Sequence, residues 1–257
     1  MPTLASLCVP GKLSTGHLVA EFNTPGIGHI LKHGGCDFVF LDCEHSGFSD
    51  ETVKWMVRAF QAADVAVITR ARAKTYTHVA RILDMGSEGI LLPMLGTAEQ
   101  AKDLAAWAHY PPVGARGAGF GMAHDEYAPG PAAPKMVAAD KRVKTFAQIE
   151  TVEGVANVDA IAATPGIDGI WIGQFDLSAS LGIPAQFDHP KFREATLAIT
   201  AAGKRHGKTL GRLVMSEAEA RQAWDDGFHM LAYGTDAATL QAAILHGTSM
   251  LRRLPGA

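Results

Sequence analysis

The 257-residue sequence predicts an α/β fold, a (β/α)8 TIM barrel, and three observations support this prediction. Short runs rich in Val, Ile, Leu and Phe alternate with longer helix-like stretches, which gives roughly eight strand–helix units. Most of these runs are continuously apolar, as expected for parallel strands that are covered on both faces. A barrel of this kind typically needs about 250 residues. We therefore expect a single domain over residues 1–257.

Eight apolar runs are the expected strands of this barrel. They cover residues 17–22, 37–42, 65–70, 89–93, 145–150, 169–173, 209–214 and 229–234. The longest irregular stretch, residues 110–134, lies between the fourth and fifth runs, and loops of this length in compact domains are usually functional or disordered. Its glycine-rich part, residues 114–121, either flanks a pocket or is a flexible loop.

Helix-start patterns separate the apolar runs. Ser49 or Asp50 is a suitable N-cap for the helix expected over residues 50–63. Thr97 with Gln100, and Ser216 with Glu219, have the spacing of capping boxes. A doubly wound open sheet is the competing architecture, but it usually carries a GxGxxG turn after its first strand. The corresponding segment here reads FNTPGIGHI, so we favour the barrel.

Composition excludes several classes of function. The chain is 47% hydrophobic and 19% charged with a net charge of −3, which is typical of a folded globular protein without a basic surface for nucleic acid or membrane. The N-terminal segment lacks the pattern of a signal peptide, and no apolar segment approaches the ~20 residues of a membrane span. Three cysteines do not form a disulfide framework. A cytoplasmic location is the simplest expectation.

Polar residues gather at the carboxyl ends of the expected strands, where barrel enzymes carry their chemistry. In FVFLDCEHSGFSD, residues 38–50, a buried strand ends in Asp42, and the turn carries Glu44 and His45. Arg70 ends the third run, Gln148 and Glu150 end the fifth, and Asp176 follows the sixth. The opposite ends show no such concentration, which indicates one site that several strands build together.

Glu150 and Asp176 are the candidate metal ligands. One helix and one strand separate them, so they are expected at the tips of neighbouring strands, about 4.8 Å apart. Two carboxylates this close share either a proton or a cation, and Mg²⁺ is commonly held by one or two carboxylates. The alternative interpretation is two solvated acids at strand ends.

Arg70 and His45 each allow two interpretations. Arg70 is either an exposed arginine at the rim or a guanidinium that binds a carboxylate or a developing oxyanion. His45 is either a surface histidine in a turn or a general base whose imidazole is oriented by Asp42.

Several segments together resemble the HpcH/HpaI aldolase family of metal-dependent pyruvate aldolases, which is related to the citrate lyase β-subunit. They are LDCEHSGF, Arg70, LLPM, QIET and IGQFDLSASLG, and the match runs in the family's order from about residue 18 to about residue 236. QIET and IGQFDLSASLG are its most specific parts.

The resemblance implies a role for each matched residue. Glu150 and Asp176 would hold a divalent ion, Mg²⁺, Mn²⁺ or Co²⁺. His45 would accept the proton, with Asp42 as its partner. Arg70 would stabilise the transition state.

Further roles follow from the same resemblance. Gln148 would contact pyruvate, and Gly173 and the backbone of Phe175 would line the pyruvate pocket. Asp84, in LDMG, would raise the basicity of the histidine. A homohexamer or another homo-oligomer is implied.

Three departures from the family pattern border the expected pocket. Cys43 replaces a glycine, Gln174-Phe175 stands where many members have Pro-Ala or Pro-Ser, and Phe22 is the nearest aromatic to a position where many carry tryptophan. They affect the choice of the acceptor aldehyde more than the reaction.

An aldolase needs an electron sink, supplied by a lysine imine or by a metal ion. Lys144 and Lys208 lie at strand starts, and Lys74 is the only candidate near the mouth, so the sequence favours a metal. The expected reaction joins pyruvate or hydroxypyruvate to an aldehyde, or cleaves a 4-hydroxy-2-oxo acid. A CoA-thioester lyase or an oxaloacetate-type decarboxylase on the same scaffold is the first rival, and a catalytically silent binding protein is the second.

Overall fold

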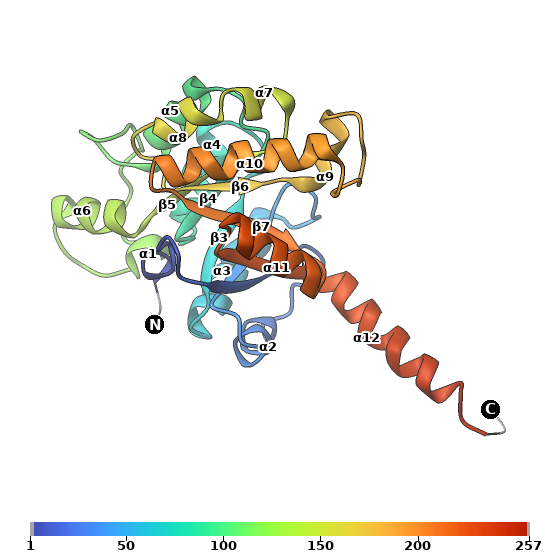
Figure 1. Ribbon diagram of the computed structural model, residues 1–257. Helices are drawn as coiled ribbons and strands as arrows, with labels where there is room; N and C mark the ends of the chain where they lie inside the picture. Colours follow the sequence, from blue (N-terminus) through green and yellow to red (C-terminus); the bar gives the residue numbers. More distant parts are fainter. Residues whose placement is uncertain (1–2, 256–257) are drawn as a thin grey trace.

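Eight parallel strands close into a barrel in the order β1 to β8, as the sequence predicts (Figure 1). The computed structural model describes residues 3–255. Each predicted run overlaps a strand, although the boundaries shift by up to three residues because pairing between neighbours decides where a strand ends. The strands are β1 Ser14–Val19, β2 Phe38–Asp42, β3 Ala66–Arg70, β4 Gly89–Leu92, β5 Lys144–Ile149, β6 Gly169–Ile172, β7 Thr209–Val214 and β8 Met230–Thr235.

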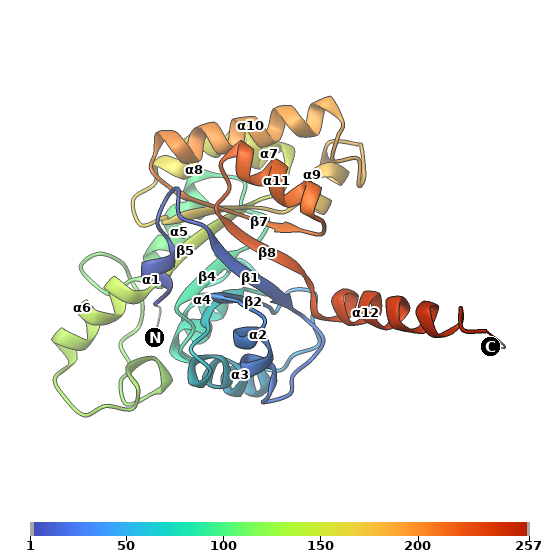
Figure 2. The same ribbon diagram turned by 60° about the horizontal axis from the view of Figure 1, so that its bottom comes forward.

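Helices surround the barrel, and one of them leaves it (Figures 1 and 2). The helix α12 extends away from the rest of the molecule in both views. The helices are α1 Leu4–Leu7, α2 Ile27–His33, α3 Asp50–Ala62, α4 Tyr76–Asp84, α5 Ala98–Ala108, the 3-10 turn η1 Ala123–Asp125, α6 Ala132–Arg142, α7 Val152–Ala156, α8 Val158–Ala163, α9 Gln174–Ser180, α10 Pro190–Arg205, α11 Glu217–Asp226 and α12 Asp236–Leu251. None in residues 3–255 is long and apolar enough to cross a bilayer.

The predicted helix starts are confirmed. The hydroxyls of Ser49, Thr97 and Ser216 each accept a hydrogen bond from the backbone N–H three residues on. The side chains of Gln100 and Glu219 do reach back, but they accept from the residue before the N-cap, at 2.8 and 3.0 Å. Each of these two side chains therefore also binds the loop that leads into its helix, which fixes the direction in which the chain leaves the preceding strand.

Large aromatic side chains fill the barrel interior, and glycines at the paired positions of neighbouring strands make room for them. Trp171 packs edge-on against Phe40, with ring centroids 5.1 Å apart. A Cβ added at Gly211 would lie 2.2 Å from the Trp171 ring. Below them α1 closes the amino end of the barrel with the buried Leu4. The interior is a packed core, so the mouth at the carboxyl ends of the strands is the place open to a substrate.

The long irregular stretch packs along the outside of α4. The Gly117 N–H donates to the Tyr76 hydroxyl at 2.9 Å, and the buried Arg116 pairs with Asp84 at 2.7 Å. Its second half contains η1 and the start of α6. Within one chain these contacts hold the stretch, including its glycine-rich part, against a helix.

Candidate active site

Asp42 and Arg70 form a buried ion pair at the barrel mouth. They are direct partners in the β2–β3 register, so their side chains leave the sheet on the same face. The Arg70 Nε donates to Asp42 Oδ1 at 2.9 Å and Nη2 donates to Oδ2 at 2.6 Å. Such a bidentate pair is stronger and more directional than a single contact. Asp42 therefore holds the guanidinium in one orientation.

This pairing corrects the expected Asp42–His45 dyad. The Asp42 carboxylate is occupied by Arg70 and by the Glu44 N–H at 2.9 Å, and its only contact with His45 is a long bond of 3.5 Å to the backbone N–H. The His45 side chain is 63% exposed, and its Nε2 lies 3.8 Å from a Glu44 oxygen. Asp42 thus shapes the turn that carries His45, while Glu44 is the acid beside the imidazole.

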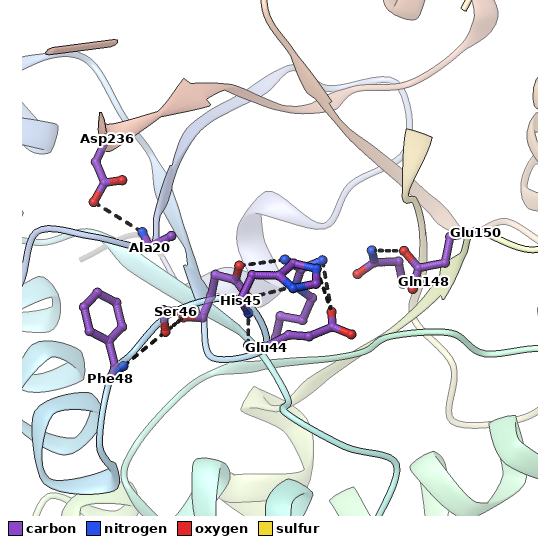
Figure 3. Close-up of polar contacts among 10 residues, drawn as sticks. Ala20, Glu44, His45, Ser46, Phe48, Gln148, Glu150 and Asp236 are labelled. Carbon is purple, nitrogen blue, oxygen red and sulfur yellow. Dashed lines mark hydrogen bonds and ion pairs between the residues drawn. The ribbon is translucent and has the colours of Figure 1, made fainter. Parts of the chain in front are cut away.

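Glu150 lies opposite this group and is almost fully buried, at 1% exposure. One of its oxygens accepts from the Met94 N–H and the other from the Gln148 side-chain amide. Met94 adopts a left-handed backbone with φ 53°, which is costly for a residue with a side chain and is typical of functional sites. Figure 3 shows Glu44 and His45 projecting toward the Gln148–Glu150 pair.

Gly173 leaves the space that the Glu150 side chain occupies. A Cβ at position 173 would lie 2.0 Å from Glu150 Oε2 and 2.8 Å from the Gln148 amide nitrogen. The requirement is one of space, because the Gly173 backbone has φ −91°, which any residue can adopt. Gly173 therefore acts on the site through Glu150.

We expect Gly173→Ala to displace the Glu150 carboxylate and to weaken divalent-ion binding by at least tenfold, with a matching loss of kcat/KM. Gly26→Ala is the matched control, because an added Cβ there meets no atom within 4 Å. Titration calorimetry with Mn²⁺ on both variants measures the effect. Unchanged affinity in Gly173→Ala would show that the Glu150 position does not matter for the ion.

The helix α9 carries Asp176 in its first turn, directly after β6. Burial is the main reason that the pKa values of Glu150 and Glu44 are raised, and the charge of Asp176 adds to both, so Asp176 lies within electrostatic range of the two carboxylates. The Phe175 ring turns away and packs edge-on against Phe187, with centroids 5.2 Å apart. The expected contact between the Phe175 backbone and the pocket stays a prediction.

The charges at the mouth do not balance. Arg70 pairs with Asp42 and Glu44, and no cationic side chain in residues 3–255 forms an ion pair with Glu150 or Asp176. Burial raises the pKa of Glu150 to about 7, and repulsion from Asp176 and Glu44 acts in the same direction. The side-chain carbonyl oxygen of Gln148 is buried and has no hydrogen-bond partner in the described chain. These oxygen donors fit a hard divalent cation.

Comparison with known proteins identifies the relatives of this chain. The HpcH/HpaI aldolase/citrate lyase family matches residues 19–243. This chain belongs to the HpcH/HpaI family. A 5-keto-4-deoxy-D-glucarate aldolase of Klebsiella pneumoniae is 34% identical over 83% of each chain, and a hydroxypyruvate/pyruvate aldolase of Chromohalobacter salexigens is 34% identical over 90% of each. The HpcH/HpaI aldolase structure from Desulfitobacterium hafniense has a TM-score of 0.90 at 32% identity, covering 96% of this chain and 95% of that one.

These relatives establish the class of reaction. The HpcH/HpaI chain is an aldolase, that is, a carbon–carbon lyase, and it has the barrel of its solved relatives. The residues expected from QIET and LDCEH meet at one mouth.

Asp84 does not join this HpcH/HpaI site within one chain. It is the last residue of α4, a helix that runs from the carboxyl ends of the strands back toward their amino ends. There its carboxylate pairs with Arg116. Within one chain the helix thus carries Asp84 away from the mouth, and its expected effect on the histidine stays a prediction.

Cys43 packs away from the mouth. Its side chain is buried among the residues between the strands and the helices, and burial raises the pKa of its thiol to about 12. A thiol of this kind is inert and does not narrow the pocket.

Two residues of the site were not assigned from the sequence. Glu44 contacts both Arg70 and His45, and only its place inside LDCEH could have indicated this. Arg212 is buried on β7 and donates to the Gln174 side chain at 3.2 Å, which braces the start of α9 from outside the barrel. No local pattern marks Arg212, because its partner lies 38 residues away.

Proposed function

We propose that this HpcH/HpaI enzyme is a divalent-metal-dependent aldolase that joins pyruvate or hydroxypyruvate to an aldehyde and cleaves the resulting 4-hydroxy-2-oxo acid. The observation that supports it best is the Glu150–Asp176 acid pair beside the oriented Arg70, since neither acid forms an ion pair with a cationic side chain of residues 3–255. The two aldolase relatives point to the same chemistry. We expect a homo-oligomer that acts on small molecules.

Glu150 and Asp176 would hold the ion, which we expect to be Mg²⁺, Mn²⁺ or Co²⁺. When bound, such an ion supplies the electron sink for the carbanion beside the ketone of pyruvate. The side-chain carbonyl oxygen of Gln148 lies next to this pair and has no hydrogen-bond partner within residues 3–255. We assign the side chain of Gln148 and the backbone of Gly173 and Phe175 to binding of the 2-oxo acid.

Arg70 and His45 carry the remaining steps. A guanidinium has five N–H groups, and Arg70 donates two of them to Asp42, while its Nη1 forms an ion pair with Glu44 at 3.2 Å. We assign the remaining N–H groups to the oxygen that develops negative charge. In cleavage the His45 imidazole takes the proton of the 4-hydroxyl, the bond between C3 and C4 breaks with its electron pair left on the pyruvate enolate, and the aldehyde leaves. The enolate then takes up a proton at C3 to give pyruvate. In synthesis C3 loses that proton, and His45 returns its proton to the oxygen at C4.

Chelation tests the proposal directly. We expect exhaustive chelator treatment to remove aldol activity, and added Mg²⁺, Mn²⁺ or Co²⁺ to restore it. Borohydride with pyruvate should add no covalent mass to the enzyme, because no lysine imine forms. Lys74 is the one lysine expected near the mouth, and its ammonium group donates to the Met94 carbonyl oxygen at 2.9 Å. A pyruvyl adduct on Lys74, or activity that survives chelation, would refute the metal-dependent mechanism.

His45→Ala is expected to lower kcat by about 10²–10⁴, the usual contribution of a general base, with the ion still bound. His33→Ala is a suitable control, since His33 is another exposed histidine, the last residue of α2. Steady-state assays of cleavage near neutral pH measure the difference. Full activity in His45→Ala would assign the proton transfer to another group.

The remaining alternatives give different products. A CoA-thioester lyase would act on acyl-CoA substrates, a decarboxylase would release CO₂ from oxaloacetate, and a silent binding protein would turn over none of them. A screen of aldehydes with pyruvate and hydroxypyruvate, with product detection, separates these cases and names the acceptor.

A further inference from the structure

The turn that follows β4 holds the Glu150 carboxylate at the barrel mouth. The Met94 N–H donates to Glu150 Oε1, and the next N–H, that of Leu95, donates to the backbone oxygen of Gln148 at 3.1 Å. Both acceptors lie at the carboxyl end of β5. The position of this turn therefore sets the direction in which the Glu150 carboxylate points.

Met94 adopts a backbone conformation that needs support from its surroundings. Its φ of 53° lies in the left-handed region, which is unfavourable for a residue with a side chain. Its side chain is 42% exposed, so burial of the side chain does little to hold the turn. A strained conformation persists only where neighbouring contacts determine it. The hydrogen bonds of the Met94 backbone therefore decide whether the turn keeps its shape.

Lys74 supplies one of these hydrogen bonds from the loop after β3. Its ammonium group donates to the Met94 carbonyl oxygen at 2.9 Å, and this oxygen accepts no other hydrogen bond within residues 3–255. The loop that carries Lys74 is itself fixed at both ends. The Ala71 N–H donates to a backbone oxygen of β4 at 2.9 Å, and the Thr75 hydroxyl caps α4. Lys74 thus reaches the turn from a backbone that is held in place.

We propose that Lys74 is a positioning residue for metal binding, because it restrains the Met94 backbone whose N–H orients the Glu150 carboxylate. Met94 links the two groups, since its carbonyl oxygen binds Lys74 and its N–H binds Glu150. Lys74 acts on the carboxylate only through this link in the described chain, where the two side chains form no ion pair. The inference rests on the proposed function, in which Glu150 is a ligand of the ion.

The charge of Lys74 and its hydrogen bond to Met94 predict opposite effects on the ion. A lysine near the mouth repels a divalent cation, so removal of its charge alone would tighten binding of the ion. Loss of the hydrogen bond would weaken binding, because the turn would no longer hold the Glu150 carboxylate in one orientation. The sign of the change in affinity therefore distinguishes positioning from a simple charge effect.

Calorimetric titration of the chelator-treated enzyme with Mn²⁺ tests the proposal. We expect Lys74→Met to raise the dissociation constant of Mn²⁺ about threefold or more, the scale set by the net contribution of one hydrogen bond. Lys74→Arg keeps both the charge and the N–H donors, so it should restore nearly the wild-type affinity. Unchanged or tighter binding of Mn²⁺ in Lys74→Met would overturn the proposal.

Lys54→Met is the matched control for this titration. Lys54 is an exposed lysine near the start of α3, and its ammonium group forms no hydrogen bond or ion pair within residues 3–255. The substitution removes the same charge and the same methylene chain as Lys74→Met, but no contact with a turn at the mouth. The affinity for Mn²⁺ should therefore stay at the wild-type value.

Hydrogen exchange provides a second readout that needs no metal. Amide exchange over residues 94–96 reports local opening of the turn, because the N–H groups of Met94 and Leu95 are bonded to the end of β5. In the metal-free protein, peptides that contain this segment should exchange about threefold faster or more in Lys74→Met than in wild type or Lys54→Met. Equal rates in the three proteins would contradict a restraint by Lys74.

The two measurements separate this inference from the proposed function. A wild type that binds no Mn²⁺ would overturn both. A wild type that binds Mn²⁺, with unchanged affinity and unchanged exchange in Lys74→Met, would overturn the inference alone. A raised KM for the 2-oxo acid at unchanged Mn²⁺ affinity would also overturn it, because Lys74 would then bind the substrate and not position Glu150.

Discussion

Replacing Glu150 or Asp176 with alanine is expected to abolish binding of the divalent ion and to lower aldol activity at least about 10³-fold. A catalytic ion contributes several kcal/mol to the transition state, and each 1.36 kcal/mol is a factor of ten in rate. Glu150 has no cationic side-chain partner that its removal would leave unpaired in the described chain, so we expect the fold to survive. Metal titration and thermal unfolding, done on the same samples, separate the two effects.

Two further variants sharpen this test. Glu150→Gln keeps the size of the side chain and its contact with Gln148, and should still lose the ion. Glu217→Gln removes an acid that is 89% exposed on α11, and should change neither binding nor activity. Normal metal stoichiometry in both alanine variants would show that the ion, if there is one, lies elsewhere.

Arg70→Met is expected to reduce both activity and stability. Loss of one preorganised donor to a developing oxyanion typically costs about 10²–10³ in kcat. The change also leaves Asp42 buried at 2% exposure without its cation, and breaking a buried pair in this way costs about 3–5 kcal/mol of unfolding free energy. Denaturant unfolding and steady-state kinetics measure the two losses.

A second pair of variants separates these two roles of Arg70. Arg72→Met removes a half-exposed arginine paired with Asp50, and should cost about 1 kcal/mol or less. The double variant Asp42→Leu/Arg70→Met should recover much of the stability, because an apolar pair often replaces a buried ion pair without loss. It should not recover activity. A double variant that is active would show that Arg70 acts only on the fold.

The architecture could be predicted because its signal is local and repeated. Continuous apolar runs such as 65–70 predict buried parallel strands, and the hydroxyl caps at Ser49, Thr97 and Ser216 fix where helices begin. The boundaries were less accurate. The first strand lies at Ser14–Val19 and not at 17–22, because its ends are set by pairing with β2 and β8, which no local window contains.

The sequence predicted which residues form the candidate site, but it did not predict which of their side chains bind one another. Strand ends of a parallel barrel meet at one mouth, so Asp42, Arg70, Gln148 and Glu150 were expected together. Spacing along the chain suggested that Asp42 serves His45, three residues away. The cross-strand register gives it instead to Arg70, 28 residues away.

By itself the sequence determined the alternation of strands and helices, the end of the barrel that carries the chemistry, and the residue types available there. Only the tertiary structure decided which carboxylate holds the guanidinium, that Asp84 lies at the far end with Arg116, and that α12 extends away from the rest of the molecule. The physical reason is the range of the forces involved. Apolar periodicity and capping act within a few residues, whereas ion pairing and burial depend on which distant segments the closed sheet brings into contact.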